Sequence, residues 1–195
     1  MKAVHRGADK VRITRAFVDH WSAQYDEKYP AGSKVHEDEQ CLKKWLAEQT
    51  GLKFLDWDHF VDLAAWKSPR AKRHYELNDA DFVREVTELA FQQSDDRLGL
   101  HILTALKGVG MPVASALLHF AFPDRYPILD YHVVNALRKA GLWSGREAPY
   151  FALLDDWPKF TQLMRGLAGS LGVSMRDLDK ALWAFDEKKG DALEA

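Results

Sequence analysis

Apolar residues recur at intervals of three and four along nearly the whole chain, which is the spacing of one buried face of an α-helix. No stretch shows the alternation of apolar and polar residues that marks a half-buried strand. The sequence therefore predicts an all-α fold, as one domain over residues 1–195 with two lobes at 1–95 and 96–195. Helix boundaries are expected near Tyr25, Gly51, Asp56, Ser68, Asn78, Gly108, Met111, Phe120, Asp130, Lys139, Pro158, Gly169 and Ser174.

Local patterns also predict how two of these helices begin and which way another one faces. Asp56 and Asn78 each precede an apolar-periodic stretch, where a short polar side chain accepts a hydrogen bond from a free amide of the first turn. In the next helix along the chain, Leu98, Ile102 and Leu106 stand four residues apart and are expected to face the core.

The charge pattern is uneven although the totals nearly balance. The formal net charge is -2, which does not by itself favour a nucleic-acid partner, because Lys and Arg neutralise the phosphates in such complexes. The stretch "KSPRAKRH" (67–74) is strongly basic, and the first fifteen residues are also basic. Acidic residues gather in "HEDEQ" (36–40) and "DALEA" (191–195). The distribution leaves a nucleic-acid partner open.

The chain has features of a protein from a reducing compartment. Cys41 is the single cysteine, so an internal disulfide and a four-cysteine iron–sulfur cluster are both excluded. The N-terminal residues have no apolar core of a signal peptide. The longest near-apolar run, 112–122, is too short to span a bilayer. We expect a cytoplasmic protein without a membrane partner.

The stretch "LKGVGMPVASALL" (106–118) joins two expected helices through Gly108, Val109 and Gly110. Such a short turn needs backbone conformations that glycine reaches at low steric cost. The turn leaves the first amides of the following helix free, at the positive end of the helix dipole. A phosphate can bind there without a basic side chain. The alternative to phosphate binding is a purely structural role, in which the turn is a tight corner between two helices.

This stretch resembles the helix-hairpin-helix motif of DNA-binding and DNA-repair proteins, which would occupy about residues 97–120. The resemblance implies that the hairpin holds a DNA phosphate without reading sequence. It also implies a monovalent cation on main-chain carbonyls as the one expected cofactor. The implied DNA-binding residues are Lys107, Gly108, Val109 and Gly110, and the implied cation ligands are the carbonyls of Thr104, Leu106 and Val109.

A second motif, "YPILDYHV" (126–133), follows one helix and a loop later, with Asp130 twenty residues after Gly110. The combination over about residues 95–140 resembles the helix-hairpin-helix superfamily of base-excision DNA glycosylases. There a Pro-Val-Asp-x-His-Val sequence opens the helix after the hairpin. This chain has one extra residue between Pro127 and Asp130. By that resemblance Asp130 is the catalytic carboxylate.

An aspartate suits cleavage of an N-glycosidic bond, because positive charge develops on the deoxyribose and an ionised carboxylate stabilises it. The base must first leave the stack, a step that aromatic side chains promote. Candidates for that step are Trp66, Tyr126, Tyr131 and Trp143. The alternative role for Asp130 is that of a helix N-cap, and both roles are compatible.

One position departs from the family pattern. Bifunctional members carry a nucleophilic lysine two residues after the second hairpin glycine, where this chain has Pro112. Because proline has no amine, Schiff-base chemistry from that position is excluded. The resemblance therefore implies a monofunctional DNA glycosylase. Two alternatives remain, namely a nucleic-acid-binding module without catalysis and a structural or interaction protein that keeps only the fold.

Overall fold

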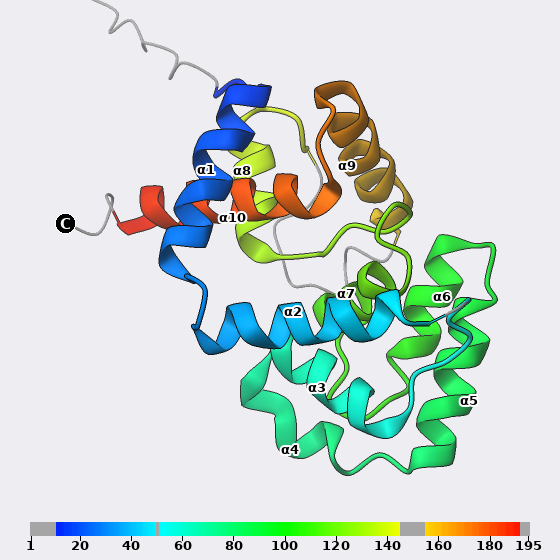
Figure 1. Ribbon diagram of the computed structural model, residues 1–195. Coiled ribbons are helices and arrows are strands. Elements are labelled where there is room, and N and C mark those ends of the chain that lie inside the picture. Colours follow the sequence, from blue (N-terminus) through cyan, green and yellow to red (C-terminus); the bar gives the residue numbers. More distant parts are fainter. Residues whose placement is uncertain (1–10, 50, 145–154, 192–195) are drawn as a thin grey trace, which may run out of the picture.

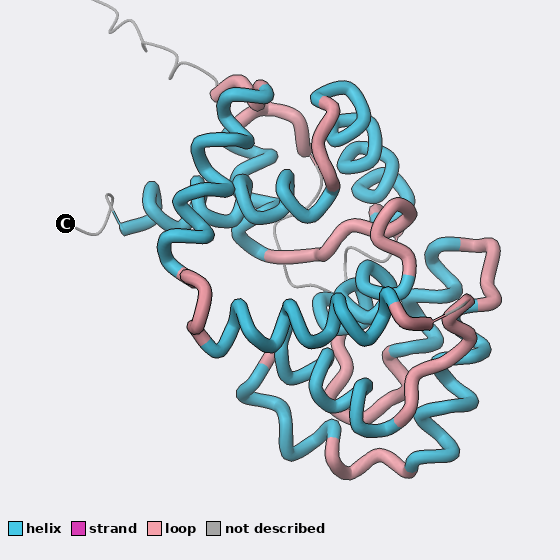
Figure 2. The backbone as a smooth tube through the Cα atoms, viewed as in Figure 1, coloured by secondary structure: helices cyan, strands magenta, loops and turns pink. Residues whose placement is uncertain are grey.

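The computed structural model describes residues 11–49, 51–144 and 155–191. Regular structure in these ranges consists entirely of helices, which confirms the predicted all-α class (Figure 2). None of the described helices is long and apolar enough to cross a membrane. The elements are α1 (Arg15–Lys28), α2 (Lys34–Ala47), α3 (Trp57–Lys67), η1 (Pro69–Ala71), α4 (Lys72–Tyr75), α5 (Ala80–Phe91), α6 (Asp96–Leu103), α7 (Met111–Ala121), α8 (Tyr131–Lys139), α9 (Trp157–Leu171) and α10 (Met175–Asp191).

The helices form two groups with α2 running between them (Figure 1). In one group, α10 packs against α1, α8 and α9. In the other group, α3 packs against α4, α5 and α7, and α6 packs against α5 and α7. The expected lobes of residues 1–95 and 96–195 do not correspond to these groups. The N-terminal α1 joins the C-terminal helices, while α6 and α7 join α3–α5.

Helix α7 forms the centre of the second group and is buried on every side. All of its residues from Val113 to Phe120 lie in the core, so the apolar run of the sequence is a core helix. Its one titratable residue, His119, is buried, and burial lowers the pKa of His119 to about 4. The neutral ring donates its Nδ1 hydrogen to the Tyr126 carbonyl oxygen at 2.7 Å. This hydrogen bond ties α7 to the loop that leads to α8.

The predicted N-cap at Asp56 is confirmed, whereas the one at Asn78 is wrong. Asp79 caps α5 by accepting hydrogen bonds from the first-turn amides. Asn78 is buried instead: its Nδ2 donates to the Tyr75 and Lys107 carbonyls, and its Oδ1 accepts the Lys107 amide at 2.8 Å. Both residues have N-cap chemistry, but Asn78 is used for a tertiary contact between α4 and the turn after α6.

The expected inward face of the helix before the hairpin is also wrong in part. Helix α6 ends at Leu103, and Leu98 is 46% exposed while Leu100 and Leu103 are buried. A Cβ on Gly99 would lie 3.0 Å from the Ala90 carbonyl oxygen, so α5 contacts α6 at the glycine. This close approach rotates the buried face of α6 away from Leu98. The residues between Leu103 and Met111 are not helical.

Candidate nucleic-acid interface

The turn between α6 and α7 has the backbone conformation that its glycines suggest. Gly108 has a φ of +83°, in the left-handed region that glycine favours. A Cβ at this position would lie 2.9 Å from His74 Cβ and from the ring of Tyr75. Gly110 is the N-cap of α7, with a φ of -93° and no side chain capping the first turn. Position 108 therefore requires glycine, whereas the backbone at position 110 also accommodates a residue with a side chain.

Side chains and main chain of this hairpin point in different directions. The side chain of Val109 is buried, whereas Lys107, Gly108 and Gly110 are exposed. Lys107 Nζ donates to the Leu77 carbonyl at 3.1 Å, so its ammonium lies beside the turn. The hairpin thus presents backbone to the outside while its apolar side chain anchors it.

One of the predicted cation ligands accepts a hydrogen bond within the turn. The Leu106 carbonyl accepts the Val109 amide at 3.1 Å, which uses one of its two lone pairs. The cation at the carbonyls of Thr104, Leu106 and Val109 stays a prediction.

Asp130 is the N-cap of α8 and also forms an ion pair across the molecule. Its Oδ1 accepts the His132 amide at 2.9 Å, and its Oδ2 lies 2.6 Å from Lys67 Nζ at the end of α3. The two side chains are 21% and 12% exposed, respectively. The carboxylate therefore lies at the junction of the two helix groups, with one edge reachable from outside.

The basic stretch of residues 67–75, which we call the basic segment, connects this carboxylate to the hairpin. Its first residue, Lys67, pairs with Asp130, and its last two, His74 and Tyr75, contact Gly108. The Tyr75 hydroxyl donates to the Ser68 carbonyl at 3.3 Å and closes the segment on itself. Its exposed basic side chains are Arg70, Lys72, Arg73 and His74.

A buried cluster of charges lies behind the Asp130–Lys67 pair. The guanidinium of Arg176 on α10 lies 2.7 Å from Glu39 Oε2 and also pairs with Asp179 and with the Tyr25 hydroxyl. Burial would raise the pKa of Glu39, but the hydrogen bonds and charges of Arg176 and Lys43 outweigh it and lower the pKa to about 2. Arg176 thereby joins α1, α2 and α10 in one network.

Asp179 connects this cluster electrostatically to the candidate site. Burial raises the pKa of Asp179 to about 6, although Arg176 and Lys67 both oppose the rise. Asp130 acts in the same direction as burial because its negative charge repels a second one. The ammonium of Lys67 therefore balances the charge of two carboxylates, one partly exposed and one buried.

The four aromatic candidates for contact with an extruded base differ in how deeply they are buried. Tyr126 and Trp143 are core residues, so neither of these two candidates presents its ring for stacking on an extruded base. Trp66 packs edge-on against Phe120 and under the guanidinium of Arg176. Tyr131 directly follows Asp130 and is 50% exposed, which leaves its ring available for stacking.

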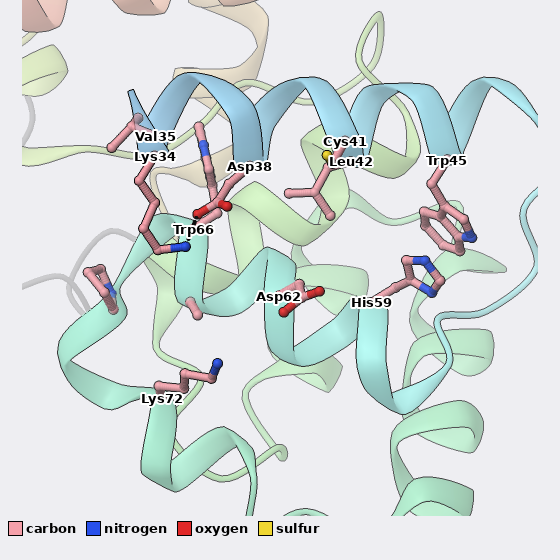
Figure 3. Close-up of a pocket in the computed structure, with 12 residues that line it drawn as sticks. Lys34, Val35, Asp38, Cys41, Leu42, Trp45, His59, Asp62, Trp66 and Lys72 are labelled. Atoms are coloured by element: carbon pink, nitrogen blue, oxygen red, sulfur yellow. Dashed lines mark hydrogen bonds and ion pairs between the residues drawn. The ribbon is translucent and has the colours of Figure 1, made fainter. Parts of the chain in front are cut away.

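A pocket of about 380 Å³ opens between α2 and α3 and is also lined by Pro69 and Lys72 of the basic segment (Figure 3). Trp66 and Lys72 belong to its lining, as do Trp45 and His59, whose rings stack with centroids 3.8 Å apart. Figure 3 shows Lys34 reaching toward Asp38 at one end, with Nζ 2.8 Å from Oδ2. The pocket borders the segment but includes neither Asp130 nor the hairpin.

Comparison with known proteins found no match among family models, curated proteins or solved structures. The site therefore has to be interpreted from its own geometry. Sequence reasoning had singled out Asp130 and the hairpin but missed Lys67 as the partner of Asp130. The two residues are 63 positions apart, and the basic character of residues 67–74 was the only local signal.

Proposed function

We propose that this protein binds the sugar–phosphate backbone of DNA along the basic segment and acts on an N-glycosidic bond at Asp130. The observation that carries the proposal is the basic segment itself, which joins the hairpin at one end to Asp130 at the other. A strand that follows the segment would place one phosphate at the hairpin and a sugar near the carboxylate. Contacts to phosphates position a strand without selecting its sequence.

The binding part follows from the charges around the hairpin. The free amides at the start of α7 attract a phosphate oxygen, and Pro112 removes one of them. Lys72, Arg73 and His74 lie on the short helix that contacts Gly108, so their positive charge supplements those amides. The formal net charge of -2 is compatible with binding because these basic residues are concentrated along one segment.

The triple variant Arg70→Gln, Lys72→Gln and Arg73→Gln tests this part. We expect weaker binding to a fluorescent duplex and a shallower dependence of log Kd on log salt concentration. If each side chain neutralises one phosphate, the slope falls by about 2.7, since each contact contributes about 0.9. Fluorescence anisotropy over a salt series measures both quantities.

The matched control replaces Lys44, Lys53 and Lys159 by Gln, which changes the net charge equally at exposed positions outside the basic segment. We expect the control to keep a salt slope within about 1 of the wild-type value. Equal slopes for the two triple variants would contradict the proposed path of the strand.

The catalytic part follows from the chemistry of Asp130. Its carboxylate is held by the first turn of α8 and by Lys67. An ionised carboxylate stabilises the positive charge that develops on the sugar as the base leaves. Without an amine at position 112, the product would be an intact strand with an abasic site.

Asp130→Asn tests the catalytic part without removing the helix cap, because asparagine is an equally good N-cap. Duplexes that each contain one damaged or mismatched base are incubated with protein and then treated with hot alkali. We expect strand breaks with the wild-type protein and a rate at least about 100-fold lower with Asp130→Asn.

Asp124→Asn is the control, since Asp124 is exposed in the loop that precedes Asp130. It is expected to keep the wild-type rate, and both variants are expected to keep duplex affinity. Equal rates for wild type and Asp130→Asn would exclude Asp130 as the catalytic carboxylate.

The second candidate function is nucleic-acid binding without catalysis. It is favoured by the full use of the Asp130 carboxylate, one oxygen on the α8 cap and the other on Lys67. On this alternative the ion pair holds the two helix groups together, and the wild-type protein leaves every duplex of the panel intact while its salt-dependent binding persists.

A further inference from the structure

A histidine–carboxylate pair lies on the first turn of α8, next to Asp130. His132 Nδ1 lies 2.8 Å from Oδ2 of Asp186 on α10, and the Asp186 side chain is only 5% exposed. The other Asp186 oxygen lies 2.7 Å from Lys139 Nζ. A buried carboxylate with two cationic partners holds the ring of His132 in place.

The pair leaves one imidazole nitrogen available. A carboxylate oxygen only accepts, so Nδ1 of His132 carries a hydrogen and Nε2 is the remaining acid–base position. Nε2 has no hydrogen-bond partner among the described residues, and the side chain is 32% exposed. The ring of Trp183 packs against the imidazole at 5.2 Å and limits its rotation.

The surroundings favour the charged form of this ring. The hydrogen bond to Asp186 raises the pKa of His132 despite partial burial, and the charges of Asp130 and Glu187 act in the same direction. The imidazole of His132 is therefore protonated more readily than a free imidazole. The charged groups around it, directly or through one ion pair, are Asp130, Lys139, Asp186, Glu187, Lys67 on α3 and Lys28 on α1.

We propose that His132 is the general acid of glycosidic cleavage and delivers its Nε2 proton to the nucleobase as the base leaves. This inference rests on the function proposed for Asp130. The bond between C1′ and the base nitrogen breaks, and its electron pair stays on the base, which takes the proton from Nε2. Asp130 stabilises the cationic sugar until water adds to C1′ and returns a proton to Nε2.

The different roles of Asp130 and His132 follow from their different surroundings. Asp130 is paired with Lys67 and offers a carboxylate oxygen to a developing positive charge, whereas the buried carboxylate of Asp186 favours the protonated form of His132 and suits it to a leaving group. Two titratable groups with different proton affinities at one site are typical of acid–base catalysis. Asp186 is then a positioning residue that orients the ring and maintains its charge.

Bases that differ in their need for a proton test this role. Hypoxanthine and uracil leave as anions unless protonated, whereas 7-methylguanine is cationic in DNA and leaves as a neutral molecule. Duplexes with each base are compared for the wild type and His132→Gln in single-turnover assays from pH 5 to 9. We expect release of the neutral bases to fall about 100-fold in the variant, and release of 7-methylguanine to fall less than about 3-fold.

The pH profile gives a second readout that a structural role would not change. For neutral bases the wild-type rate is expected to fall as pH rises through the pKa of His132, because the acid form is lost. This limb is expected to be absent in His132→Gln and to move to lower pH in Asp186→Asn. His20→Gln, at an exposed histidine of α1, is the control for the substitution itself, and thermal melting verifies folding.

Several outcomes would overturn the inference. Wild-type rates and an unchanged pH limb in His132→Gln would do so, as would an equal loss for neutral and cationic bases. Release of 7-methylguanine alone by the wild type would remove the need for an acid while leaving the role of Asp130 intact. Release of no base by the wild type would overturn the function proposed for Asp130 together with this inference.

Discussion

Replacing Arg176 by methionine is expected to lower the free energy of unfolding by about 3–5 kcal/mol, as for other buried ion pairs that lose one partner. The substitution keeps much of the side-chain volume but leaves Asp179 buried without its ion-pair partner and leaves Glu39 with Lys43 as its one remaining ion-pair partner among the described residues. The loss therefore reflects one unpaired and one under-compensated buried carboxylate more than the attraction that was removed. Urea unfolding followed by circular dichroism measures it.

The pH dependence of this loss has a definite sign. The pKa of Glu39 lies below its ordinary value in the folded wild type, at about 2. Its contribution is therefore fully present above the unfolded pKa and disappears as pH falls through the folded one. We expect the difference between wild type and Arg176→Met to shrink as pH falls from about 4.5 towards 2.

Arg97→Met is the control, because Arg97 forms an exposed ion pair with Asp95 at 3.2 Å. Exposed pairs contribute at most about 1 kcal/mol. If Arg176→Met also lowered the free energy of unfolding by no more than about 1 kcal/mol, the buried cluster would not hold α1, α2 and α10 together.

Gly108→Ala is expected to destabilise the protein by about 3 kcal/mol, combining the cost of a left-handed alanine with that of overpacking. The φ of +83° disfavours any side chain, and the new Cβ would lie 2.9 Å from His74 Cβ and the Tyr75 ring. Because this contact joins the hairpin to the basic segment, duplex affinity is expected to fall in parallel. Urea unfolding and anisotropy measure the two effects.

Gly110→Ala is the matched control within the same hairpin. Its φ of -93° is accessible to alanine, and the nearest atom to an added Cβ is Pro112 Cδ at 3.8 Å. We expect a change in stability below about 1 kcal/mol, mainly from the poorer N-cap propensity of alanine. Equal losses for the two variants would contradict the different backbone requirements of the two glycines.

The accuracy of the sequence predictions depends on the range of the interactions involved. The cap at Asp56, the start of α7 at Met111 and the cap of α8 at Asp130 all follow from neighbouring residues, and all three are confirmed. The cap at Asn78 is wrong because Asp79 offers the same chemistry one residue later. Asn78 is instead buried against the turn after α6, where its side chain binds the main chain of Lys107.

Local sequence patterns are equally limited in predicting which face of a helix is buried. The four-residue spacing of Leu98, Ile102 and Leu106 is a valid helical pattern, but α6 stops at Leu103 and contacts α5 at Gly99. A repeat within one helix does not reveal where a neighbouring helix approaches most closely. That position depends on the smallest side chain in the contact, which periodicity alone does not identify.

By itself the sequence determined the all-α class, most helix boundaries, the glycine turn and the capping role of Asp130. These depend on helical periodicity and on hydrogen bonds between residues a few positions apart. Only the tertiary structure decided that Lys67 meets Asp130 and that the basic segment contacts Gly108. The packing of α1 on α10 and the Arg176 cluster likewise join distant parts of the chain. Such contacts depend on how whole helices pack, and no local pattern encodes that arrangement.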